Sequence, residues 1–146
     1  GFADAWRSST RFVTCFLGNV DTTAHTLAYH SGGQGPILHR SAATGEWTRI
    51  EPTGMPLGIL PSLRPKPAQV LHLGPGDTVA LISEGVFEYE NPAGEMYGNE
   101  RVEELLAAPA GNSAQQQVQE LVSAVDAYAG EAPQNDDMTI VVLRRL

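Results

Sequence analysis

The sequence has very little cysteine and no long apolar run. Its one cysteine, Cys15, lies in an apolar stretch, so no disulfide can form within the chain and no thiolate metal cluster is possible. No stretch approaches the length of a membrane span, and no basic-then-apolar signal peptide opens the chain. We therefore expect a cytoplasmic protein with no membrane partner.

Basic residues are also scarce. Nine Lys and Arg residues stand against 17 Asp and Glu residues, which gives a net charge of -8. Nucleic-acid binding needs clustered positive charge at the phosphates, so we expect no nucleic acid partner. An acidic balance favours solubility, and it also suits a protein that binds divalent cations.

The remaining composition is typical of one globular domain spanning residues 1–146. The chain is 42% apolar, and 15 Gly with 10 Pro indicate many turns and a sheet-rich fold. Strands come first, then helices, then one strand, which predicts an α+β fold with a mainly antiparallel sheet. The predicted strands are 12–20, 24–30, 37–39, 47–50, 69–73, 78–83 and 138–143, and the predicted helices are 100–107 and a longer one ending before Gly130.

Local signals mark the ends of these elements. The first ten residues are typical of the tail of an element that began upstream. Residues 31–36 hold three glycines and a proline, which predicts a loop. Asn99 is predicted to cap the first helix, and Asn112 or Ser113 the second.

Carboxylates lie at the ends of two predicted strands. Glu84 directly follows strand 78–83 and precedes Gly85, which we expect to let the backbone turn sharply. Asp136 and Asp137 directly precede strand 138–143. If the two strands are neighbours, these carboxylates meet at one end of the sheet. Clustered oxygen ligands are what Mg²⁺ and Mn²⁺ prefer, so the pattern predicts a metal site.

A structural alternative stays open on spacing alone, because acidic residues at strand ends are commonly solvated turn formers. Asp77, in Pro-Gly-Asp before a strand, is interpreted as a turn residue only. The histidines share no ligand spacing and are interpreted as surface or strand-face residues; they are His25, His30, His39 and His72. No nucleophile elbow or phosphate-binding glycine loop is present, so we predict no catalytic residue beyond the metal ligands.

Six segments, taken in order, resemble the sporulation stage II protein E branch of the bacterial PPM-type metal-dependent Ser/Thr protein phosphatases, in its C-terminal part. They are 12–14 with Asp21 and 27–29, Met-Pro-Leu-Gly-Ile at 55–59, Leu-Gly-Pro-Gly-Asp at 73–77, Ser-Glu-Gly-Val at 83–86, 91–98 with Arg101, and Asp-Asp-Met-Thr at 136–139. The resemblance implies an α-β-β-α sandwich. It also implies two Mn²⁺ or Mg²⁺ ions and a water that attacks phosphoserine or phosphothreonine directly.

On this resemblance Glu84 and Asp136 are metal-ligand positions, with Asp137 beside them and Gly85 supporting the backbone. The implied substrate is a phosphorylated regulatory protein of the anti-sigma-factor antagonist type. The family's aspartate is Glu84 here, one methylene longer, and its Ala-Gly-His is Ser-Gly-Gly at 31–33. Its opening strands, with a Gly-Asp pair and a bridging aspartate, have no counterpart.

Three functions follow from the resemblance and these departures. The first is a phosphatase module, either a fragment of a longer protein or a degenerate relative, that binds one ion or none and has weak activity or none by itself. The second is a pseudophosphatase that acts as a regulatory binding module. The third is a domain that pairs with a second copy, as a homodimer, to cover exposed sheet edges.

Overall fold

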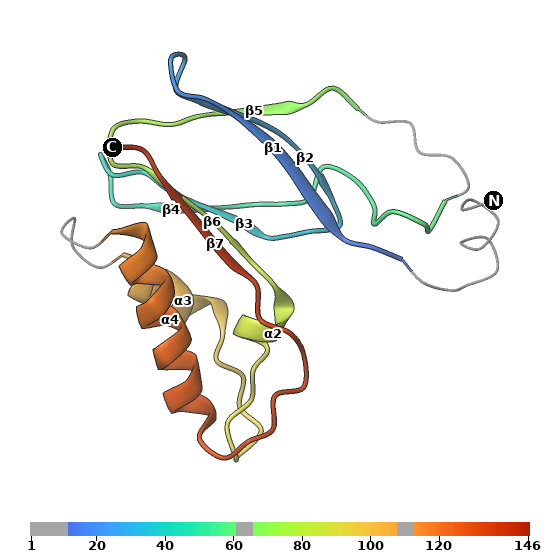
Figure 1. Cartoon of the computed structure of the whole chain (residues 1–146), viewed down its shortest axis with the longest axis vertical. Coiled ribbons are helices and arrows are strands. Elements are labelled where there is room, and N and C mark those ends of the chain that lie inside the picture. The colour runs from blue at the N-terminus through green and yellow to red at the C-terminus, as the bar shows by residue number, and fades with distance from the viewer. Residues whose placement is uncertain (1–11, 61–65, 108–112) are drawn as a thin grey trace. The chain divides into compact units, whose positions relative to one another are not determined.

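The structure is a computed structural model that describes residues 12–60, 66–107 and 113–146 (Figure 1). The chain forms two compact units, one of residues 1–36 with 50–73 and one of residues 37–49 with 74–146. The interpretation of the first ten residues lies outside the described part. No helix within the described ranges has the length and apolar character needed to cross a bilayer.

The first unit contains a three-stranded antiparallel sheet in the order β1-β2-β5. The strands are β1 (Cys15–Asp21), β2 (Thr26–Gly32) and β5 (Gln69–His72). The predicted hairpin is confirmed, but the loop predicted from residue 31 is wrong at its start. Ser31 and Gly32 still pair with β1, opposite Phe16 and Cys15.

The central strand β2 buries the side chains of one of its faces. Leu27 and Tyr29 are each 4% exposed, and the ring of Phe16 stacks on Tyr29 with 5.3 Å between ring centroids. Successive side chains along a strand point to opposite faces of the sheet. Leu17, next to Phe16 on β1, therefore lies on the opposite face, where it is 71% exposed.

The second unit contains a four-stranded sheet in the order β4-β3-β6-β7, with helices packed on one face (Figure 1). The strands are β3 (Ile37–Arg40), β4 (Trp47–Ile50), β6 (Thr78–Ile82) and β7 (Ile140–Arg144). The helices are α2 (Glu84–Phe87), α3 (Asn99–Leu106) and α4 (Ala114–Ala129). The core is formed by Leu38, Ala80, Ile82, Val86, Tyr97, Val102, Leu106, Leu121 and Val125.

The helix ends test the predicted caps. Ser113 caps α4 with a complete capping box, in which its hydroxyl accepts from the Gln116 amide, and Gly130 ends the helix as predicted. Asn99 is not a cap. It is the first residue of α3, and Gly98, with a φ of 84°, occupies the cap position without a side-chain hydrogen bond.

Asp77 is more than a turn residue, and His39 is more than a strand-face residue. The Asp77 side chain is buried and accepts hydrogen bonds from the amides of Gly74 and Ala42, each at 2.8 Å. Its other contact is the Nε2 atom of His39 at 3.1 Å. The carboxylate therefore joins the turn before β6 to the end of β3, which a local reading of Pro-Gly-Asp does not show.

These contacts set the pKa of Asp77. Burial acts to raise it, but the two amides and His39 together outweigh burial and hold the pKa below its ordinary value. A carboxyl group with a lowered folded-state pKa stabilises the fold above its unfolded pKa, about 3.9, and this stability is lost as the pH falls through the folded-state pKa.

We therefore expect Asp77→Asn to destabilise the protein by about 2–3 kcal/mol at neutral pH. The loss should shrink as the pH falls below about 4, because protonation removes the same charge from the wild type. Urea unfolding across this pH range measures both effects. Asp126→Asn, on an exposed site of α4, is the control. A loss for Asp77→Asn that is equal at pH 7 and in acid would contradict this account.

Candidate metal centre

β6 and β7 are antiparallel neighbours, so the end of β6 and the start of β7 lie together. Their register runs from Thr78 opposite Arg144 to Ile82 opposite Ile140. The pairing continues past both strands through Ser83. Its amide donates to the Thr139 carbonyl at 3.0 Å, and its hydroxyl accepts from the Thr139 amide at 2.8 Å. Glu84, directly after Ser83, and Asp136, three residues before Thr139, are thereby brought to one end of the sheet.

Gly85 is needed here for a reason other than the predicted sharp turn. Its φ is not positive, and it lies within the short helix α2, which the sequence did not predict. A Cβ at Gly85 would lie 2.4 Å from the carbonyl oxygen of Asp137. That same oxygen accepts a hydrogen bond from the Ser83 hydroxyl at 3.1 Å. The missing side chain therefore lets the segment before β7 pack directly on the start of α2.

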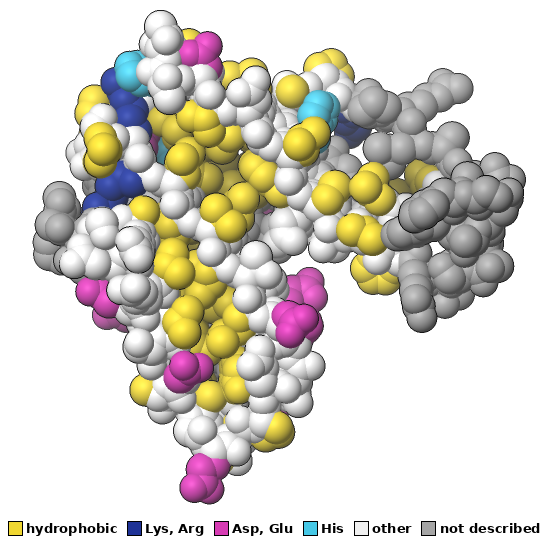
Figure 2. Space-filling view, in the orientation of Figure 1, with side chains coloured by type: hydrophobic (Ala, Val, Ile, Leu, Met, Phe, Trp, Pro, Cys, Tyr) yellow, Lys and Arg dark blue, Asp and Glu magenta, His cyan; other side chains and the backbone are white. Residues whose placement is uncertain are grey.

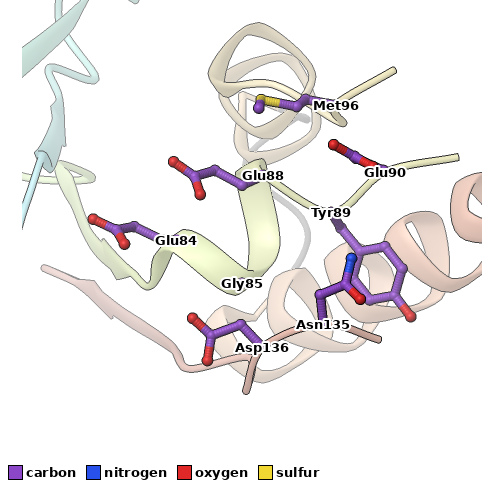
Figure 3. A pocket seen from close by; sticks show the side chains of 8 residues that line it. All are labelled: Glu84, Gly85, Glu88, Tyr89, Glu90, Met96, Asn135 and Asp136. Carbon is purple, nitrogen blue, oxygen red and sulfur yellow. The ribbon is translucent and has the colours of Figure 1, made fainter. Parts of the chain in front are cut away.

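Glu84 and Asp136 line the same hollow, with a volume of about 190 Å³. Figure 3 shows their carboxylates extending to the same side of the view, one from the start of α2 and one from the segment before β7. A volume near that of six water molecules leaves room for an ion with part of its water shell. The hollow is lined by Glu84, Gly85, Glu88, Tyr89, Glu90, Met96, Asn135 and Asp136.

The two aspartates differ in what they contribute. Oδ1 of Asp136 accepts from the Asp137 amide at 2.8 Å, and the Asp136 carbonyl accepts from the Gln134 side chain at 2.8 Å. The bond from the Asp137 amide fixes the direction of the Asp136 carboxylate, and the bond from Gln134 holds its backbone. Asp137 does not line the hollow, and its recorded contacts there are made by its backbone. The metal-ligand role of each residue stays a prediction.

Sequence reasoning missed the remaining lining residues. Glu88 lies one helical turn beyond Glu84, a spacing that would have indicated Glu88 as a lining residue if α2 had been predicted.

The segment that contains Met96 is held in place by Arg101 and Tyr128. The Arg101 guanidinium donates to the Tyr97 carbonyl at 2.6 Å and lies 4.7 Å from the Tyr128 ring centroid, while the Tyr128 hydroxyl donates to the Met96 carbonyl at 3.2 Å. This explains the presence of Arg101 in the motif around 91–98.

Carboxylate oxygens are suitable ligands for a hard divalent cation. The described residues supply too few of them at this site for a two-ion centre. No group of three or more His, Cys, Asp or Glu residues placed to hold a metal exists among residues 12–60, 66–107 and 113–146. Glu84 and Asp136 would be two ligands of one ion. Figure 2 shows acidic side chains dispersed over the face drawn there, so the net charge of -8 does not by itself mark a cation site on that face.

Comparison with known proteins tests the family that the sequence motifs indicate. The family model described as "Stage II sporulation protein E (SpoIIE)" matches residues 2–146. The chain belongs to the SpoIIE family. The match covers both compact units, and it includes the strand ends that carry Glu84 and Asp136.

Relatives of this SpoIIE-family chain are longer than the chain itself. Phosphoserine phosphatase RsbU of Bacillus subtilis (strain 168) is 28% identical over 137 residues, which are 94% of this chain and 40% of RsbU. The SiaA-PP2C domain of Pseudomonas aeruginosa has a TM-score of 0.75 at 23% identity, over 99% of this chain and 56% of that one. The chain thus spans about half or less of these relatives.

A second similar structure is the phosphatase domain of SpoIIE from Bacillus subtilis, described as Mn presoaked. It has a TM-score of 0.65 at 19% identity, over 90% of this chain and 56% of that one. Together with the SiaA-PP2C domain it shows that this SpoIIE-family chain has the fold of PP2C phosphatase domains. The predicted α+β class with antiparallel sheets is confirmed.

Proposed function

We propose that this chain, residues 1–146, is the part of a metal-dependent Ser/Thr phosphoprotein phosphatase domain that supplies Glu84 and Asp136 to the metal centre. The observation that supports this most is that both carboxylates line one hollow at the joined ends of β6 and β7. The relative RsbU, named as a phosphoserine phosphatase, favours an enzyme over a binding module.

The proposed cofactor is Mn²⁺ or Mg²⁺, held here by Glu84 and Asp136, with Asp137 beside them. When bound, such an ion activates a water and offsets negative charge on a phosphoryl group. The chain's own residues hold the site together. Ser83 joins the two strand ends, and the Asp137 amide directs the Asp136 carboxylate. With two ligands rather than a full set, we propose that one ion binds weakly and that this chain alone is a poor catalyst.

The proposed substrate is a phosphoserine or phosphothreonine on a regulatory protein of the anti-sigma-factor antagonist type. The family membership and the similarity to RsbU support this class. A hollow of about 190 Å³ suits a phosphorylated side chain presented by a protein surface better than a large small-molecule substrate. The proposed location is the cytoplasm, where such a regulatory protein would be found and where a chain with a single cysteine needs no disulfide.

A phosphate-release assay on a phosphoserine peptide tests the proposal. With Mn²⁺ present we expect weak turnover that chelation of the metal removes and that Asp136→Ala abolishes. Asp126→Ala, on the exposed face of α4, should leave the rate unchanged. No turnover, together with no Mn²⁺ binding by calorimetry, would overturn the proposed function for this chain.

A further inference from the structure

Ser83 occupies the N-cap position of α2, but its hydroxyl does not cap that helix. A serine at this position commonly accepts a hydrogen bond through its side chain from a backbone amide in the first turn. In this chain the Ser83 backbone carbonyl accepts from the Val86 amide at 3.1 Å, and no side-chain cap bond forms. The hydroxyl therefore serves a purpose other than capping.

The hydroxyl extends the antiparallel pairing of β6 with β7. The register that sets Ile82 opposite Ile140 continues with Ser83 opposite Thr139, and the Ser83 amide donates to the Thr139 carbonyl at 3.0 Å. In a regular ladder the Thr139 amide would donate back to the Ser83 carbonyl. It donates to the Ser83 hydroxyl instead, at 2.8 Å. The side chain thus takes the place of a backbone acceptor that α2 already uses.

The same hydroxyl also holds the backbone of Asp137. It donates to the Asp137 carbonyl at 3.1 Å, while the Asp137 amide donates to Oδ1 of Asp136 at 2.8 Å. Both backbone polar groups of Asp137 are therefore engaged, the carbonyl by Ser83 and the amide by the Asp136 carboxylate. Because Glu84 directly follows Ser83, this chain of bonds links the backbone beside one proposed ligand to the carboxylate of the other.

We propose that Ser83 is a positioning residue of the metal centre, and that its hydroxyl sets the placement of the Asp136 carboxylate relative to Glu84. The inference rests on the proposed function, in which these two carboxylates hold one ion. Ser83 does not line the hollow, so it acts through Asp137 and not as a ligand. Removing a group that orients metal ligands by hydrogen bonds typically lowers metal affinity by about 10- to 100-fold.

Two substitutions separate the hydroxyl from the rest of the side chain. Ser83→Ala removes both hydroxyl bonds, whereas Ser83→Thr keeps a hydroxyl at this half-buried position. Asp77→Asn, just before the other end of β6, is the control for lost stability, because it destabilises the same unit outside the hollow. Calorimetric titration with Mn²⁺, on variants that circular dichroism shows to be folded, measures the affinity. Amide hydrogen exchange without metal reports on Thr139.

We expect Ser83→Ala to bind Mn²⁺ about tenfold more weakly than the wild type and to exchange the Thr139 amide faster. Ser83→Thr should restore both values, and Asp77→Asn should bind Mn²⁺ as the wild type does despite its lower stability.

A wild type that binds Mn²⁺ and a Ser83→Ala variant that binds it equally well would overturn this inference alone. Equal weakening in Ser83→Ala and Asp77→Asn would also overturn it, since stability and not ligand placement would then govern binding. A Ser83→Thr variant as weak as Ser83→Ala would count against the hydroxyl in the same way. A wild type that binds no Mn²⁺ would overturn the proposed function together with the inference.

Discussion

Gly85→Ala is expected to destabilise the fold by about 3 kcal/mol. The new Cβ would lie 2.4 Å from the carbonyl oxygen of Asp137 and 2.9 Å from its carbonyl carbon. Both are backbone atoms, so neither can rotate away as the end of a flexible side chain could. Relief requires the ends of β6 and β7 to separate, which also moves Glu84 from Asp136. Thermal unfolding should show a Tm lower by roughly 6–12 °C.

Gly54→Ala is the matched control for this prediction. A Cβ at Gly54 would have one neighbour within 4 Å, the carbonyl oxygen of Ser31 at 3.9 Å, and the φ of Gly54 is not positive. We expect its free energy of unfolding to change by less than about 1 kcal/mol. Equal losses in the two variants would show that the contact with Asp137 is not what makes Gly85 necessary.

Removal of either carboxylate from the hollow is expected to weaken Mn²⁺ binding at least about tenfold. Glu84→Gln and Asp136→Asn each remove one anionic ligand while keeping the size of the side chain. If both ligands hold the same ion, each single variant already removes most of the binding. The Mn²⁺ affinity of the double variant should then be close to that of either single variant. Isothermal titration calorimetry with Mn²⁺ measures these affinities.

Asp126→Asn carries the same change in charge at an exposed site outside the hollow, and it should bind Mn²⁺ as the wild type does. Strictly additive losses for the two hollow variants would instead indicate two separate binding sites. A loss in Asp126→Asn equal to that in Asp136→Asn would mean that general acidity, rather than this hollow, attracts the cation.

The sequence predicts the strands of this fold better than their arrangement. Alternation and apolar runs locate the seven strands of the described residues, including β1, β4 and β5, which bury no residue completely. Which strands share a sheet depends on contacts far apart in the chain, and no local pattern shows that β5 joins β1 and β2 while β3 pairs with β6. α2 escapes prediction because four residues that include a glycine are too short for a helical period to show.

The site divides in the same way. That Glu84 and Asp136 lie at one end of the sheet could be predicted, because Glu84 follows the end of β6 closely and Asp136 lies four residues before β7. Glu88 depends on a helix that the pattern does not show. The role of Gly85 is steric and is set by Asp137, 52 residues away in the numbering, so a local reading assigns the glycine to a turn instead.

The central claim is that Glu84 and Asp136 bind one cation between the ends of β6 and β7. Paramagnetic broadening of backbone amide signals by substoichiometric Mn²⁺ tests it most directly, since the effect reports nearness to the ion residue by residue. We predict that the amides of Gly85 and Asp136 broaden together, at the same metal concentration, and that both stay sharp in Glu84→Gln. Broadening of one amide without the other, or undiminished broadening in that variant, would contradict the shared site.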